Sequence, residues 1–521
     1  MKKLDLDLVP ERENPSPDYY CTWQSQLYAC CNKGPQAQRD IMTEQGVFGT
    51  GDPARDTALG LGWAHQYKDA QKDLFLVLDD SWDVPIGAAP DGGRWYGSLA
   101  LARDKFPHAY GMERAAPFTE DEPIDMDEVE GAMKRLSDKV KALGWRGLGG
   151  WVCVQKANMG IDVRKTNGNR NAKKMTDEDY WREAVLRCGR AGWRYWKMDW
   201  GKDASSPEVR NLVTELAHRY APELYIEHAI AHKVIPVADV FRSYDAFTLM
   251  AIPLTISRMA KFLAYDTEAG YGGLVNCEDE PYVAAALGCT LGVMRHGMTG
   301  NLPNGSPDAS FPALHRNFKT KLAEVVRTVR WHRIAPAFGA CGKETLVDAE
   351  QLTDTWDVVS QPREIEAWWK YTDGSHIEES APARMARRLP LADVTRDSEG
   401  ERPFVISSRN PNGVVSVATL GRTAGRRYFL PRCEVTQEIG NADTVGLFGH
   451  YAAAVLKGSA ITASTKVYMQ DLAGDTAYDI TEHCTVADGM LTIPGEYIDR
   501  IGTLANGAGD TSEPGVVVKL V

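Results

Sequence analysis

The chain has 521 residues, a net charge of -12 and a sequence pI near 5.5. This length predicts two or three domains. The acidic balance argues against nucleic acid or an anionic membrane as the main partner, because either would need a basic face. The 43% apolar and 25% charged residues, with 14 Trp, are typical of a globular protein with an aromatic-rich interior or cleft.

The start of the chain and the cysteines carry little functional signal. Residues 1–18 are polar and contain proline, so we expect an N-terminal arm that leads into the first strand. The pattern there predicts no apolar region of a signal peptide or membrane anchor. The compartment therefore stays open: periplasmic or secreted if a signal was removed, otherwise cytoplasmic. The ten cysteines lack the spacing of a disulfide scaffold or a zinc site.

Strand-like and helix-like patterns alternate through the first part of the chain. Strands are predicted at 19–28, 73–82, 147–155, 193–201, 223–228, 240–245, 273–280 and 292–297, and helices at 125–143, 177–190, 207–219, 252–264 and 311–333. About eight strand and helix units over some 320 residues predict a (β/α)8 barrel, an α/β fold. A doubly wound open sheet is the alternative, but no phosphate-binding glycine fingerprint follows the first strand.

The pattern changes near residue 340. Short β-type runs separated by turn signals follow at 364–371, 403–408, 413–419, 463–469 and 514–521. They predict an antiparallel β-sandwich. We therefore expect a catalytic barrel with its N-terminal arm over residues 1–340 and a C-terminal sandwich over residues 341–521.

The end of the fourth predicted strand carries the strongest chemical signal. Lys197 and Asp199 lie two residues apart, so on a strand they share one face. A carboxylate beside an ammonium stays ionised, as a nucleophile for an acetal carbon must. Asp199 is therefore a nucleophile candidate, and a structural ion pair is the alternative. Asp245, three residues after Arg242, is the acid/base candidate, with Asp239 as the fallback.

Other polar and aromatic residues follow the predicted strands, at the barrel face where such enzymes place their sites. Carboxylates accept hydrogen bonds from sugar hydroxyls and tryptophans stack on the C–H faces of sugars, so this set predicts a pyranoside pocket. Its members are Trp23, Asp79, Asp80, Gln155, Lys197, Glu227, Arg242 and Asp279.

Each of these signals also has a structural interpretation. Asp79 and Asp80 could cap a helix, and Arg242 and Asp245 could form a purely structural pair. We expect His228 and His296 to be hydrogen-bonded wall residues, since neither has a second ligand at metal-binding spacing. The basic loop 164–174 is a solvated lid, or alternatively a site for a carboxylate or sulfate on the substrate.

In this order the motifs resemble the melibiase-type members of the clan D glycoside hydrolases, the α-galactosidase and α-N-acetylgalactosaminidase families 27 and 36. Trp23 matches the tryptophan that ends their first strand, and residues 79–82, Asp-Asp-Ser-Trp, match the Asp-Asp-x-Trp motif that binds sugar hydroxyls. Residues 197–199, Lys-Met-Asp, match the Lys-x-Asp motif with the nucleophile. Glu227 matches a glutamate on the fifth strand, and residues 242–245 match the segment with the acid/base.

The chain also departs from the pattern of this family. Arg242 and Asp245 are one residue closer together than in the family. Residues 226–229 read Ile-Glu-His-Ala where the galactose-specific enzymes have a Cys-Glu-Trp-Pro-like segment, and residues 276–279 read Asn-Cys-Glu-Asp in place of Asn-Asp-Pro-Asp. The resemblance is therefore to a distant member, whose glycone need not be galactose.

The resemblance implies a retaining exo-glycoside hydrolase that removes a terminal α-linked, α-galactoside-like sugar by double displacement, with Asp199 as nucleophile and Asp245 as acid/base. It implies no metal or organic cofactor, and an oligosaccharide or glycoconjugate as partner. A homo-oligomer is left open. The expected substrate-binding residues are Trp23, Asp79, Asp80, Trp82, Gln155, Lys197, Glu227, Arg242 and Asp279.

Four alternatives stay open. The first is a transglycosylase on the same scaffold. The second is a glycosidase for another glycone: a β-L-arabinopyranoside, an N-acetylgalactosaminide or an anionic sugar. The third is a non-catalytic carbohydrate-binding protein. The fourth is a different barrel enzyme, such as a metal-dependent lyase or an aldolase that forms an imine on Lys197.

Overall fold

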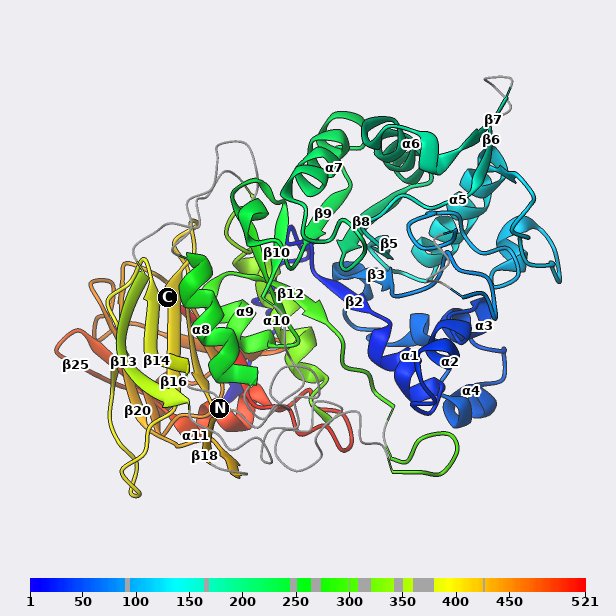
Figure 1. Ribbon diagram of the computed structural model, residues 1–521. Coiled ribbons are helices and arrows are strands. Elements are labelled where there is room, and N and C mark those ends of the chain that lie inside the picture. The colour runs from blue at the N-terminus through cyan, green and yellow to red at the C-terminus, as the bar shows by residue number, and fades with distance from the viewer. Residues whose placement is uncertain are drawn as a thin grey trace. The chain divides into compact units, whose positions relative to one another are not determined.

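The structure is a computed structural model (Figure 1). It describes residues 1–89, 94–163, 168–243, 251–263, 273–298, 300–307, 320–341, 350–358, 379–424 and 427–521.

Eight parallel strands of the described chain close a barrel, in which each strand neighbours the next one along the sequence. β3 is buried over its whole length, as expected for a strand covered on both faces. The closed barrel confirms the (β/α)8 prediction. Its strands are β2 (Tyr19–Cys21), β3 (Phe75–Leu78), β5 (Gly147–Val152), β8 (Trp193–Met198), β9 (Tyr225–His228), β10 (Val240–Arg242), β11 (Leu274–Glu278) and β12 (Thr290–Val293).

The longer helices follow the predicted periodicity. α5 begins after Asp125, whose side chain accepts hydrogen bonds from the backbone N–H groups of Asp127 and Glu128. α6 begins after Thr176, which caps it in the same way through Asp179 N–H. The α-helices are α1 (Trp23–Ala29), α2 (Pro35–Asp40), α3 (Glu44–Phe48), α4 (Pro53–Leu59), α5 (Met126–Ala142), α6 (Asp177–Arg190), α7 (Pro207–Tyr220), α8 (Ala251–Leu263), α9 (Pro281–Leu287), α10 (Ala323–Ile334) and α11 (Gly495–Gly502).

Short 3-10 helices and small sheets connect these elements. The 3-10 helices are Trp63–His65, Gln71–Asp73, Pro107–Tyr110, Ala172–Lys174, His232–Val237 and Thr481–His483. One small sheet contains β4 (Ile124–Asp125), β6 (Gly160–Val163) and β7 (Gly168–Asn171), and another contains β18 (Arg422–Ala424) and β19 (Arg427–Phe429).

The prediction of one long first strand over residues 19–28 is wrong. β2 ends at Cys21, and α1 begins at Trp23. Gln and Leu are good helix formers, and the buried Gln26 donates a hydrogen bond from its side chain to the backbone O of Asp80 at 3.0 Å. This contact with the end of the next barrel strand favours a helix here, although the local alternation of residues resembles a strand.

Strands from the C-terminal part of the chain, together with the strand Lys2–Lys3 at the N-terminus, form two sheets that share a hydrophobic core. The larger has the order β1 (Lys2–Lys3), β24 (Ala477–Asp479), β23 (Val467–Asp471), β27 (Gly515–Leu520), β21 (Thr444–Phe448), β17 (Val415–Leu420), β16 (Phe404–Arg409), β14 (Glu379–Arg387), β13 (Glu350–Val358). The smaller has the order β15 (Asp393–Val394), β20 (Glu434–Gly440), β22 (Ala453–Gly458), β26 (Met490–Pro494), β25 (Thr485–Ala487).

Both sheets contribute to one cluster of buried side chains, which includes Val417 of the larger sheet and Leu456 and Ile493 of the smaller one. Most strand pairs are antiparallel, while β14–β16, β17–β21 and β20–β22 are parallel. The expected sandwich of largely antiparallel sheets is therefore confirmed. The strand predicted at 364–371 lies outside the described residues.

The chain divides into two compact units. One contains residues 1–17, 243–292 and 311–521, and the other contains residues 18–242 and 293–310. In the first unit the N-terminal strand β1 pairs antiparallel with β24 near the end of the chain. The functional boundary expected between residues 340 and 341 stays a prediction.

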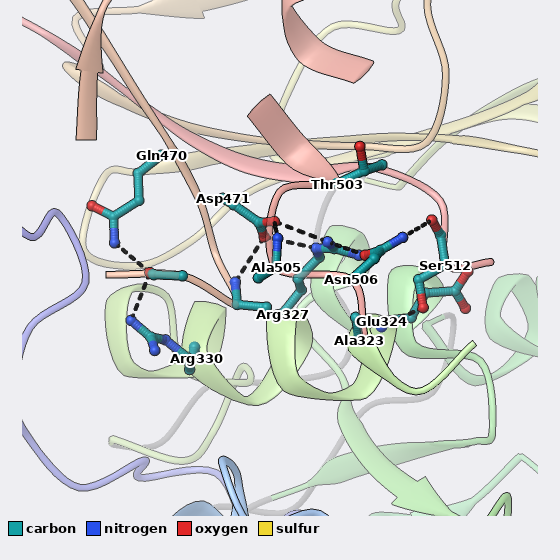
Figure 2. Close-up of polar contacts among 12 residues, drawn as sticks. Ala323, Glu324, Arg327, Arg330, Gln470, Asp471, Thr503, Ala505, Asn506 and Ser512 are labelled. Carbon is teal, nitrogen blue, oxygen red and sulfur yellow. Dashed lines mark hydrogen bonds and ion pairs between the residues drawn. The ribbon is translucent and has the colours of Figure 1, made fainter. Parts of the chain in front are cut away.

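Within the first unit, α10 is tied to β23 by a buried ion pair (Figure 2). Arg327 is fully buried and donates from Nε and Nη2 to the two carboxylate oxygens of Asp471, at 2.8 and 3.0 Å. Its Nη2 also donates to the side-chain oxygen of Asn506 at 2.6 Å. No helix among the described residues has the length and apolar character needed to cross a membrane.

Candidate active site

The end of β8 is fixed by an arginine from the following helix. Arg210 on α7 is fully buried and donates hydrogen bonds to the backbone oxygens of Met198 at 3.3 Å and Asp199 at 2.5 Å. The backbone N–H of Asp199 donates to the O of Val152 on the neighbouring strand at 3.1 Å. Asp199 therefore leaves the barrel strand with a well-defined backbone position.

Both carboxylate oxygens of Asp199 accept hydrogen bonds. Arg242 donates from Nη2 to Oδ1 at 3.0 Å, and Trp151 donates from Nε1 to Oδ2 at 3.1 Å. Burial alone would raise the pKa of Asp199, but the charges of Arg242 and Lys197 and the Trp151 hydrogen bond lower it below its usual value. The side chain keeps 15% of its surface exposed. Asp199 is thus an ionised and oriented carboxylate that solvent can reach.

Lys197 has a different ion-pair partner from the one predicted. Its Nζ lies 2.8 Å from Oδ2 of Asp79 and 3.5 Å from Sγ of Cys21, while Asp199 pairs with Arg242. The reason is that Lys197 lies within β8, and its long side chain extends to Cys21 at the end of β2 and to Asp79 just after β3. Burial alone would lower the pKa of Lys197, but the Asp79 carboxylate raises it well above its usual value.

The carboxylate of Asp79 is almost fully occupied by protein groups. Its Oδ1 accepts from the backbone N–H of Asp80 at 2.7 Å, and its Oδ2 accepts from Lys197 and from the thiol of Cys21 at 2.8 Å. Only 2% of the residue is exposed. This arrangement favours a role in holding Lys197.

Asp80 lies in a separate polar group. Its carboxylate accepts hydrogen bonds from the hydroxyl of Ser81 and from that of Tyr96, the latter at 3.0 Å. Arg39 donates from Nε to the Tyr96 hydroxyl at 2.7 Å and lies 3.9 Å from the Asp80 carboxylate. Burial raises the pKa of Asp80 to about 6, despite the hydrogen bond from Ser81.

Glu227 supports the arginine that holds the nucleophile candidate. It is fully buried on β9, where it accepts hydrogen bonds from the hydroxyls of Tyr195 at 2.8 Å and Tyr19 at 3.3 Å. Nε of Arg242 lies 3.9 Å from its Oε1. Glu227 and Asp199 therefore contact the same guanidinium group, and Glu227 is placed to position Arg242.

Three aromatic rings form a cluster that contacts Asp199 through Trp151. We call Tyr96, Trp151 and Trp200 the aromatic cluster. The ring centroid of Trp200 is 4.9 Å from that of Tyr96 and 5.7 Å from that of Trp151, both edge-on, and the other two centroids are 5.7 Å apart. Tyr96 and Trp151 are not among the site residues predicted from the sequence, although Trp151 lies within the barrel strand predicted at 147–155.

Two of the predicted binding residues, Trp82 and Gln155, occupy supporting positions, and the role expected of Trp23 stays a prediction. Trp82 is fully buried, packs against Trp193 and donates from Nε1 to the backbone O of Trp151 at 2.9 Å, which favours a packing role. Gln155 donates to the backbone O of Tyr96 at 3.2 Å, so its amide joins two loops of the site. Trp23 is the half-buried first residue of α1.

The remaining candidates are not brought to Asp199 by the described contacts. Asp245 and residues 164–167 of the basic loop lie outside the described residues. Asp279 belongs to the other compact unit, where it follows β11, is fully buried and has a left-handed backbone with φ of 56°. The roles expected of Asp245 and Asp279 stay predictions.

Asp239, the second acid/base candidate, and His228, at the end of β9, both have hydrogen-bond partners within the fold. Asp239 accepts from the backbone N–H of Ile226 at 3.0 Å and contacts Nε2 of His218 at 2.5 Å, so both its oxygens are engaged. The ring nitrogens of His228 lie 3.2 Å from Nη1 of Arg210 and 2.7 Å from the hydroxyl of Thr214. Burial lowers the pKa of His228 well below its usual value, which favours the neutral ring of a wall residue.

Comparisons with known proteins find similarity to solved structures. No protein-family model and no curated protein matches the chain. The chain is similar to α-galactosidase I from Mortierella vinacea, with 10% identity, 98% of this chain and 97% of that one covered, and a TM-score of 0.37. It is also similar to a family 27 β-L-arabinopyranosidase from Geobacillus stearothermophilus in complex with arabinose, with 11% identity, 89% and 93% covered, and a TM-score of 0.38.

Proposed function

We propose that this chain is a retaining exo-glycoside hydrolase that removes a terminal α-linked sugar and uses Asp199 as its nucleophile. One observation carries the proposal: Asp199 follows a barrel strand, and its solvent-accessible carboxylate is held by Arg242 and Trp151 and kept ionised. Residues after the strands of such barrels commonly form the active site. An oriented carboxylate anion is the group that attacks an anomeric carbon in retaining hydrolysis.

In the proposed reaction, an Asp199 oxygen forms a bond to the anomeric carbon while the bond to the leaving oxygen breaks. Asp245 donates a proton to that oxygen, then takes a proton from the water that releases the sugar with its configuration retained. Lys197 and Asp80 would hold ring hydroxyls. Arg242 would orient Asp199 and stabilise its charge, a role that the observed contact supports in place of orienting Asp245.

The environment of Lys197 disfavours an aldolase-type reaction on this chain. Imine formation needs a neutral amine, which lysines acquire through a lowered pKa. Asp79 has the opposite effect on Lys197 and raises its pKa. This ammonium suits a donor to a sugar hydroxyl, so we prefer the glycosidase to the imine-forming alternative.

The direct test is hydrolysis of a panel of aryl α-glycosides and an aryl β-L-arabinopyranoside. We expect one glycone to be cleaved, and proton NMR of the first-formed sugar to show the anomer of the substrate. A first product of opposite configuration would contradict the double displacement. If no member of the panel is cleaved while a sugar still binds, the carbohydrate-binding alternative would be favoured.

The contact between Trp151 and Asp199 predicts a change in the pH dependence of catalysis. Trp151→Phe keeps an aromatic ring but removes the indole N–H that lowers the pKa of Asp199. The acid limb of the kcat/KM profile should therefore move to higher pH, with about a 10-fold loss at the optimum, the magnitude of one lost charge-assisted hydrogen bond. A loss of activity with an unmoved acid limb would show that Trp151 acts only in packing.

A further inference from the structure

Trp200 is the exposed member of the aromatic cluster. Its exposed fraction is 40%, compared with 1% for Tyr96 and 2% for Trp151. Both buried rings meet Trp200 edge-on. A large apolar side chain is thus supported by two fixed rings and still presents much of its surface to solvent. Sugars and aromatic groups stack on such surfaces.

The backbone at Trp200 is also fixed. The O of Trp200 accepts a hydrogen bond from Val154 N–H at 2.9 Å, and Asp203 N–H donates to the O of Val154 at 2.9 Å. Gly201 between them has φ of 146°, and a Cβ there would lie 2.6 Å from the O of Val154. Lys202 N–H also donates to the side chain of Gln155 at 3.3 Å. These contacts hold the segment against residues 154–155.

The solvent-exposed fraction increases in the order Lys197, Asp199 and Trp200, where Lys197 is the residue proposed to bind sugar hydroxyls. Lys197 is 3% exposed, the Asp199 side chain 15% and Trp200 40%. An exo-acting enzyme encloses the terminal sugar and leaves the rest of the substrate on the solvent side. With sugar hydroxyls at Lys197 and the anomeric carbon at Asp199, the leaving group would emerge on the side where Trp200 is exposed.

From this we infer that Trp200 is a specificity residue for the leaving group, and that its exposed face stacks on a second pyranose ring joined through the bond that is cleaved. The inference rests on the proposed glycosidase function and deepens it. It adds that the preferred natural substrate carries a sugar, rather than a small alcohol, next to the terminal residue.

The test compares Trp200→Ala with the parent on three substrates of the glycone that the parent accepts: the glycosyl fluoride, the methyl glycoside and a disaccharide. The ratio of parent to variant kcat/KM is taken for each substrate, so the intrinsic reactivity of each leaving group cancels. We expect a ratio near 1 for the fluoride, which has no ring to stack. For the disaccharide we expect a ratio of about 3–10, in the range of a single stacking interaction.

Two further variants serve as controls. Trp200→Phe keeps an aromatic face and should recover most of the disaccharide activity. Tyr220→Ala removes another exposed aromatic side chain, on α7, and should leave all three ratios near 1. An unchanged rate on the fluoride also shows that Trp200→Ala is folded.

The results of this test distinguish the role of Trp200 from the proposed glycosidase function. Equal ratios for all three substrates, with an active parent, would overturn the role of Trp200 and leave the glycosidase proposal standing. A parent that cleaves no glycosyl fluoride and no glycoside would overturn both.

Discussion

Asp199→Ala should lower kcat/KM on the substrate of the parent by at least about 10³-fold, because the variant lacks the group that forms the covalent intermediate. The remaining site should still bind the sugar, since Lys197 and Asp79 keep their contact. Initial rates on an aryl glycoside with an activated leaving group measure the loss.

Adding azide to this variant tests the mechanism directly. The anion fits the space left by the carboxylate and can attack the anomeric carbon from the same face, and Arg242 still supplies a positive charge there. We expect recovery of leaving-group release and a glycosyl azide whose configuration is inverted relative to the substrate, identified by NMR. Asp138→Ala, which removes an exposed carboxylate on α5, is a control that should retain full activity.

Two results would contradict the assignment of Asp199. One is a variant as active as the parent. The other is an inactive but folded variant that releases no product with azide, even from the activated substrate. Asp199→Asn adds a check on the carbohydrate-binding alternative, which predicts unchanged sugar affinity and no turnover by the parent.

Arg327→Met should be the most damaging single change to stability that we predict. Asp471 would remain a buried carboxylate that accepts, within the described part of the chain, from the backbone N–H groups of Ala473 and Ala505, each at 2.9 Å. Figure 2 shows Asp471 in contact with Arg327 and Ala505. Removing one partner of a buried pair leaves a charge without compensation, so we expect a loss of about 3–5 kcal/mol in the free energy of unfolding. Urea unfolding followed by circular dichroism measures it.

A second substitution tests that explanation. Adding Asp471→Asn to Arg327→Met keeps an oxygen acceptor for one of the two N–H groups and removes the buried charge that has lost its partner, so it should recover part of the stability. Lys134→Met is the matched control, because it breaks an exposed ion pair with Asp138 and should leave the unfolding midpoint unchanged. A midpoint that Arg327→Met does not move would show that the pair contributes little.

The sequence by itself determined the barrel and much of its helical cover. The apolar run before Asp79 and Asp80 became the fully buried β3, and the periodic apolar residues of 125–143 became α5. These features depend on local pattern: a strand covered on both faces is apolar throughout, and a helix on a barrel is apolar on one side. Such patterns can be detected without knowing what packs against them.

Only the tertiary structure decided which groups meet at the site. Lys197 and Asp199 are two residues apart, but their carboxylate and cationic partners are Asp79 and Arg242, 118 and 43 residues away in sequence. Trp151 reaches Asp199 from β5, across 48 residues. Barrel closure sets these contacts, because side chains of different strands converge only once register and twist are fixed. Spacing along one strand predicts a shared face, but not the partner on it.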